Sequence, residues 1–194
     1  MTFLKRLYVW TLAKAAHRHA ERWLALISFI ESSVFPIPPD VMLLPMCLAR
    51  RERSLRYAGI CTVASVIGGL AGYGIGYFFW QAVGEPIIVF YGYEAQFAEF
   101  QARFDAYGAL LVFLFGLTFF PYKVITIAAG VAAMDPLAFL IASIAARAPR
   151  FYVEAALLWK FGEPIRDFIE QRLTLLTTLF AILLVGGFVL IKLV

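Results

Sequence analysis

A run of 28 residues, 57–84, contains no charged side chain, and this feature restricts most strongly how the chain can fold. An α-helix needs about 20 mainly apolar residues to cross the hydrocarbon core of a bilayer. A second uncharged run, of 19 residues, occupies 173–191. Of the 194 residues, 62% are hydrophobic and 15% are charged, a balance typical of integral membrane proteins. We therefore expect one all-α, polytopic membrane domain over 1–194.

A third segment, 136–161, is also long enough to span a bilayer, although Arg147, Arg150 and Glu154 lie in its middle. The hydrocarbon core disfavours each of these charges, so the segment is an unusual span. Together with the two uncharged runs, it gives three predicted transmembrane helices.

The remaining apolar regions, 23–49 and 106–134, are each interrupted halfway by proline. In the first region, the prolines of ESSVFPIPPD (31–40) separate limbs of 13 and nine residues. In the second region, the break falls at Pro121. Limbs this short do not reach across a bilayer, and proline ends a helix. We therefore predict two re-entrant helical hairpins.

Basic residues flank the first hairpin on both sides. One cluster lies in 1–22, where we expect a basic interfacial helix, and the other in 50–56. A re-entrant hairpin keeps both clusters in the cytoplasm, as the positive-inside tendency requires. The chain is expected to be multi-pass with a cytoplasmic N-terminus, and its location in the bacterial inner membrane is an expectation from the family resemblance given below.

The second hairpin is expected to enter from the opposite face. The span at 57–84 leads to an outer segment, 85–105, with four acidic residues and one basic residue. Within it, 94–107 carries aromatic residues at helical spacing, which predicts an amphipathic helix on the outer interface.

A weak internal repeat agrees with this opposed arrangement. VFP at 34–36 matches FFP at 119–121, and VGEPI at 83–87 matches FGEPI at 161–165. Two copies in opposite orientation form an inverted repeat, the design by which many secondary transporters build a midplane site.

Gly68, Gly72 and Gly76 recur every four residues in the first span and allow close helix approach. Two interpretations stay open: packing between helices of one chain, or the seam of a homodimer.

Six ionisable residues lie inside the apolar segments: Glu31, Asp40, Lys123, Arg147, Arg150 and Glu154. Exposing all six to lipid would cost roughly 15 to 20 kcal/mol. They must therefore face one another or water. Three are acidic and three are basic, so complete pairing in structural salt bridges is one interpretation.

The alternative interpretation is a site for an anion. Arg147 and Arg150 are three residues apart and project from one helical face, next to Pro149. Two guanidiniums on one face suit a phosphate group, and Lys123 would serve as an auxiliary cation. Glu154 lies one turn beyond Arg150 and can pair with it. The helix N-termini at both breaks would also favour an anion.

Glu31 and Asp40 are predicted to respond to protons. Carboxylates held away from bulk water can exchange protons as a ligand arrives and leaves. For Asp40 a second interpretation is a cap on the helix that follows it.

These residues together resemble the DedA family, also called the SNARE-associated or VTT-domain family. Glu31 followed by FPIPPD (35–40) is similar to its signature, and FPYK (120–123) with RAPRF (147–151) resembles its YqaA-like branch. The resemblance implies two re-entrant hairpins that face each other. It also implies translocation of undecaprenyl phosphate or phospholipid between leaflets, with the proton-motive force involved in bacterial members. Supporting residues in these motifs are Pro36, Pro38, Pro39, Pro121 and Gly130.

The sequence therefore predicts a transporter, scramblase or flippase for an anionic phosphate-headed lipid, linked to protons. Two rivals stay open: a transporter of small ions or solutes, and a structural or assembly protein. An enzyme is not expected, because the chain lacks a GxSG motif with a distant histidine and an HExxH motif, and its two histidines both lie near the N-terminus. Cys47 and Cys61 lack metal-ligand spacing, so no metal or cofactor is expected. Nucleic acid is not an expected partner, because the basic clusters lie beside apolar runs.

Overall fold

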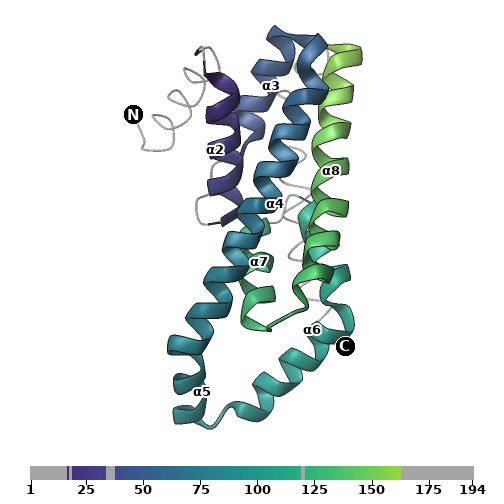
Figure 1. Cartoon of the computed structure of the whole chain (residues 1–194). Helices are drawn as coiled ribbons and strands as arrows, with labels where there is room; N and C mark the ends of the chain where they lie inside the picture. The colour runs from purple at the N-terminus through teal and green to yellow at the C-terminus, as the bar shows by residue number, and fades with distance from the viewer. Residues whose placement is uncertain (1–16, 18, 34–37, 119–120, 163–194) are drawn as a thin grey trace, which may run out of the picture.

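The computed structural model describes residues 17, 19–33, 38–118 and 121–162, and this part of the chain contains helices and no strands. The helices are α2 (Ala20–Ser33), α3 (Asp40–Ala49), the 3-10 turn η1 (Arg51–Arg53), α4 (Ser54–Phe79), the π-helical turn η2 (Trp80–Gly84), α5 (Glu85–Tyr91), α6 (Glu94–Leu117), α7 (Tyr122–Val131) and α8 (Pro136–Phe161). The prediction of an all-α chain is confirmed for these residues (Figure 1).

Within the described part of the chain, two helical stretches are long and apolar enough to cross a membrane. The first, Arg51–Tyr91, contains the predicted span 57–84. The second is Glu94–Leu117, which the sequence had assigned to a hairpin limb and an interfacial helix. The predicted helix 136–161 is present as α8, but its arginines and Glu154 lower its hydropathy, and it is not one of these two. The predicted span 173–191 lies outside the described residues, as does most of the segment 1–22.

Helices α2, α3 and α7 lie against the long helix α4, whereas α6 packs on α7 and α8. In Figure 1, α2 and α3 lie beside its upper half, whereas α6 and α7 lie around its lower half. Both α3 and α7 are ten residues long and begin directly after proline, Pro39 and Pro121 respectively. A short helix therefore follows each proline break, as predicted, and re-entry of these helices into a membrane stays a prediction.

The predicted boundary between an interfacial helix, 94–107, and a hairpin limb starting at Ala106 is not seen. Residues 94 to 117 form one continuous helix, α6. The sequence changes from polar to apolar near Ala106, but polarity alone does not interrupt backbone hydrogen bonding, and no proline is present there. Stacked aromatic rings support the polar end of α6, with Trp80 and Phe97 only 3.8 Å apart between ring centroids.

The regularly spaced glycines of α4 pack against other helices of the same chain. A Cβ at Gly68 would collide with the backbone carbonyl of Phe29 in α2, and a Cβ at Gly76 would collide with that of Ile127 in α7. Gly130 of α7 lies equally close to the carbonyl of Tyr73 in α4. The glycine face therefore brings α2 and α7 against α4, which confirms the packing interpretation for this face.

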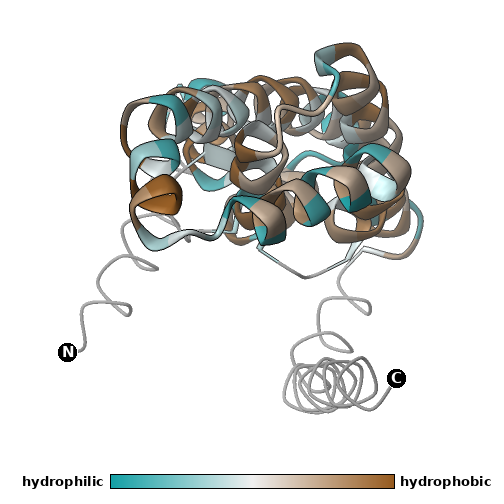
Figure 2. Cartoon of the chain, turned by 90° about the horizontal axis from the view of Figure 1, so that it is seen from below, coloured by the Kyte–Doolittle hydropathy of each residue, from teal (hydrophilic) through white to brown (hydrophobic). Residues whose placement is uncertain are grey.

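The exterior of the bundle is largely apolar. Phe78, Phe90 and Val63 are at least 60% exposed, and many other large apolar side chains on α4, α6 and α8 face outward. Figure 2 shows hydrophobic ribbon segments around the outside of the bundle as well as within it. By contrast, the largest fully buried side chain is that of Arg147. Charge inside and apolar surface outside favour lipid as the surrounding solvent.

Candidate functional site: a polar centre where two helix pairs meet

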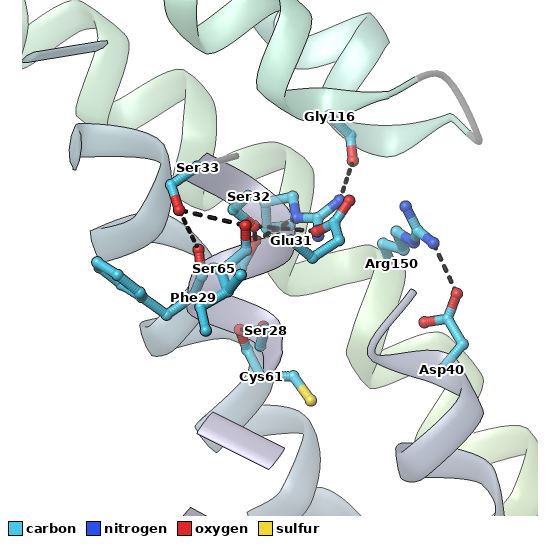
Figure 3. Close-up of polar contacts among 12 residues, drawn as sticks. Ser28, Phe29, Glu31, Ser32, Ser33, Asp40, Cys61, Ser65, Gly116 and Arg150 are labelled. Atoms are coloured by element: carbon cyan, nitrogen blue, oxygen red, sulfur yellow. Dashed lines mark hydrogen bonds and ion pairs between the residues drawn. The ribbon is translucent and has the colours of Figure 1, made fainter. Parts of the chain in front are cut away.

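Arg147, near the middle of α8, joins three different helices. Its Nε donates to Ser65 Oγ of α4 at 2.6 Å, one terminal nitrogen donates to the Gly116 carbonyl of α6 at 3.5 Å, and the other donates to Glu31 Oε2 of α2 at 3.1 Å. The guanidinium therefore connects the end of α2 with the end of α6, as the dashed contacts at Glu31 and Gly116 in Figure 3 show.

Aromatic rings complete the surroundings of Arg147. Its guanidinium carbon lies 4.7 Å from the ring centroid of Tyr122 and 4.8 Å from that of Phe151. Both rings are buried, and desolvated cation–π contacts of this kind are among the stronger ones. With no exposed surface and partners at all three nitrogens, Arg147 is held in one position.

A row of serines supports this ion pair. Ser32 lies 2.7 Å from Ser65, oxygen to oxygen, and also donates to Glu31 Oε2 at 3.1 Å. One turn earlier on α2, Ser28 donates to the Cys61 carbonyl at 2.8 Å. The i, i+4 spacing of Ser28 and Ser32 places both hydroxyls on the face of α2 that packs on α4. In a helix buried against another, such hydroxyls fix the register of the contact.

Arg150 makes a second, more accessible ion pair. It donates to Asp40 Oδ2 of α3 at 2.8 Å and to the Thr118 carbonyl after α6 at 3.4 Å. The side chains of Arg150 and Asp40 are 15% and 22% exposed, whereas that of Arg147 is 0% exposed. Both arginines thus bond to the first helix pair and to the end of α6. Figure 3 shows the contact between Arg150 and Asp40.

Asp40 does not cap its own helix, so that interpretation is wrong. Pro39 occupies the cap position of α3 without a side-chain hydrogen bond, and the Asp40 carboxylate turns toward Arg150 instead. The amides of Met42 and Leu43 donate to the Pro39 carbonyl. The N-terminus of α3 is therefore less open to an anion than the sequence suggested.

Glu154 joins this second pair. Its carboxyl group is close enough to Asp40 for a hydrogen bond and is also beside Arg150. Asp40 Oδ1 is buried and accepts no hydrogen bond from a donor group elsewhere in the described chain. Three carboxyl groups, those of Glu31, Asp40 and Glu154, thus accompany two guanidiniums.

The remaining candidates have different positions. Lys123 is half-buried on α7, and its ammonium group forms no ion pair with a described residue. Pro39 is fully buried, Pro38 and Pro121 are exposed, and Pro36 lies outside the described residues. Gly130 acts in helix packing rather than at the arginines. The role of Lys123 as an auxiliary cation stays a prediction.

Sequence reasoning did not identify the neutral partners of Arg147, which are Ser65, the Gly116 carbonyl and the ring of Tyr122. Ser28, Ser32 and Ser65 carried a usable signal, because serines at helical spacing in apolar segments need a polar partner. A backbone carbonyl carries no such signal, since every residue has one. α8 also continues through Pro149, so the proline does not separate the two arginines into different helices.

The chain is similar to proteins that are described only as uncharacterized. An uncharacterized protein of Haemophilus influenzae is 40% identical over 174 residues, which cover 88% of this chain and 90% of the relative. An uncharacterized homolog from Histophilus somni is 38% identical over 174 residues, covering 88% of this chain and 91% of that protein. No family model and no solved structure matches the chain.

Proposed function

Because the chain belongs to one family with these uncharacterized proteins of Haemophilus influenzae and Histophilus somni, we propose a shared function for the family: proton-linked movement of a phosphate-headed lipid across a membrane. In this proposal the family is a branch of the DedA proteins and lies in the bacterial inner membrane with its N-terminus in the cytoplasm. The α2–α3 and α6–α7 pairs are re-entrant hairpins from opposite faces, related as an inverted repeat.

One observation carries the proposal. Arg147 and Arg150 each bond to both hairpins, at Glu31 and Gly116 for Arg147 and at Asp40 and Thr118 for Arg150. Arginine forms bidentate bonds to phosphate as well as to carboxylate. The phosphate head of a lipid can therefore replace the carboxylate of Glu31 or Asp40 at the same guanidinium. Because this removes the bond between the arginine and the first hairpin, the contact between the ends of the two hairpins loosens.

Exposure assigns different roles to the two arginines. The side chain of Arg150 is 15% exposed, so Arg150 is the group that the phosphate head of the lipid reaches first. Arg147, with no exposed surface and two aromatic neighbours, keeps α8 fixed to α2 and α4. When the phosphate head displaces Asp40 from Arg150, the Asp40 carboxylate takes up a proton, next to the carboxyl group of Glu154. This proton uptake links lipid movement to protons. Glu31 plays the corresponding part at Arg147.

The test is lipid movement in reconstituted vesicles that contain a labelled polyprenyl phosphate or phospholipid. The wild-type protein should move the lipid between leaflets, and Arg150→Gln should slow this movement at least about tenfold, since a charge-assisted phosphate contact is lost. Arg103→Gln is the matched control, because Arg103 is exposed and pairs with Glu99 on α6, away from the two arginines. Absence of lipid movement by the wild type, with or without a pH gradient, would refute the proposal.

A structural role is the second candidate, favoured by the fact that both arginines are paired in this structure. It predicts that neutral, size-matched replacement of Arg150, Asp40 and Glu154 together leaves cellular function intact. A transporter of small ions is distinguished in the same vesicles, because it would carry inorganic phosphate without lipid.

A further inference from the structure

A basic pocket lies away from the polar centre, at the end of the bundle where α2 begins and α3 ends. It has a volume of about 450 Å³. Its charged and titratable lining residues are His17, His19, Glu21, Arg22, Arg50 and Arg53. These side chains come from two segments that are distant in sequence, 17–22 and 50–53, so the fold brings them together.

The charge of the pocket is not neutralised within the described chain. Glu21, the one acidic lining residue, is bonded to Arg56 at 2.8 Å and lies 4.0 Å from Arg53. Arg22 and Arg50 form no ion pair with another described residue. Three arginines against one glutamate leave the pocket about two charges positive, before any contribution from its histidines. A pocket of this charge is suited to a doubly charged anion.

The position of the pocket indicates where such an anion would come from. Tyr57, which begins the uncharged run 57–84, and Met46 of α3 also line it. The pocket is therefore bordered on one side by exposed arginines and on the other by the apolar helices. Basic groups at such a boundary attract the phosphates of anionic lipids.

We propose that this pocket binds a phosphate-bearing anion through Arg22, Arg50 and Arg53. The shared chemistry is the phosphate group, supplied either by a lipid head or by free phosphate. Guanidinium groups bind phosphate in a bidentate manner, and several around one cavity can hold it from more than one side. This inference does not depend on the chain moving lipid, since binding and movement are measured separately.

The experiment compares lipids and free phosphate on the purified full-length chain in detergent. Phosphatidic acid and phosphatidylcholine are titrated and the bound lipid is counted by native mass spectrometry, while inorganic phosphate is added as a competitor. Phosphatidic acid should bind at least about tenfold more tightly than phosphatidylcholine. Displacement by millimolar phosphate assigns the site to the free anion, and resistance to it assigns the site to the lipid; both results support a phosphate site.

Three variants localise the binding. Arg50→Gln should weaken phosphatidic acid binding about tenfold, whereas Arg103→Gln, which removes the same charge from exposed α6, should change it less than about twofold. Glu21→Gln should strengthen binding severalfold, because it removes the acidic group and releases two arginines; a damaged fold cannot produce this gain. Equal binding of the two lipids, or equal loss in Arg50→Gln and Arg103→Gln, would overturn the proposal.

Discussion

At the scale of residues, the two arginines of α8 differ in what surrounds them. Arg147 is enclosed by hydrogen bonds and two rings, whereas Arg150 keeps partial exposure beside two carboxyl groups. Removing one partner of a buried ion pair leaves the other charge without compensation, which costs far more than losing a surface pair. The two positions should therefore respond differently to substitution.

Arg147→Gln should lower the free energy of unfolding by about 3 to 5 kcal/mol, because Glu31 loses its buried partner. The measurement is denaturant unfolding in detergent, as a double-mutant cycle with Glu31→Gln. The double variant should be less destabilised than the sum of the single variants. The same cycle on the exposed Arg103–Glu99 pair should give a coupling of about 0.5 kcal/mol or less. Strict additivity at Arg147 and Glu31 would show that their contact contributes nothing.

Asp40→Asn combined with Glu31→Gln should remove the response of lipid movement to an imposed pH gradient. A carboxamide cannot take up or release the proton that the proposed exchange requires. The assay is movement of labelled lipid in vesicles at several pH gradients, with the exposed Glu99→Gln as control. If the doubly substituted protein still follows the gradient as the wild type does, the proton link is wrong.

At the scale of elements, the sequence predicts features set by neighbouring residues better than contacts between distant helices. The starts of α3 and α7 were predictable, since proline acts on its own neighbours. The continuity of α6 was not predictable, because the sequence changes from polar to apolar near Ala106 and a change of polarity looks like a boundary between two segments. The gathering of Glu31, Asp40, Arg147 and Arg150 was predicted from their charge, but the specific partners depend on how distant helices meet.

Gly76→Ala should destabilise the fold by about 1 to 3 kcal/mol. The added Cβ would meet the backbone carbonyl of Ile127, so α4 and α7 must move apart. Gly74 is the matched control: it lies on the same helix, with nothing within 4 Å of an added Cβ. Gly74→Ala should therefore be neutral or slightly stabilising, by up to about 1 kcal/mol. Thermal unfolding in detergent compares the two variants, and equal effects would mean that the close crossing does not contribute to stability.

At the scale of the whole molecule, the helix pairs α2–α3 and α6–α7 meet around charges in the middle of α8. The stretch Arg51–Tyr91 contains 41 residues, so at 1.5 Å per residue it is about 60 Å long, twice the hydrocarbon thickness of about 30 Å. Part of it must therefore tilt or lie in the interface. Segment lengths in the sequence predict that both pairs re-enter, and charge asymmetry alone predicts their sides of entry. Helix α6, with 24 residues, is itself long enough to cross a bilayer.

The side of entry is measured most directly with single cysteines and a membrane-impermeant maleimide, after Cys47 and Cys61 are replaced by alanine. The four reporter positions are Arg22, Arg50, Gly92 and Asp135. If both helix pairs enter and return, Arg22 and Arg50 are labelled from the cytoplasmic side, and Gly92 and Asp135 from the opposite side. Labelling of Arg22 and Arg50 from different sides, or of Gly92 and Asp135 from different sides, would contradict the opposed hairpins.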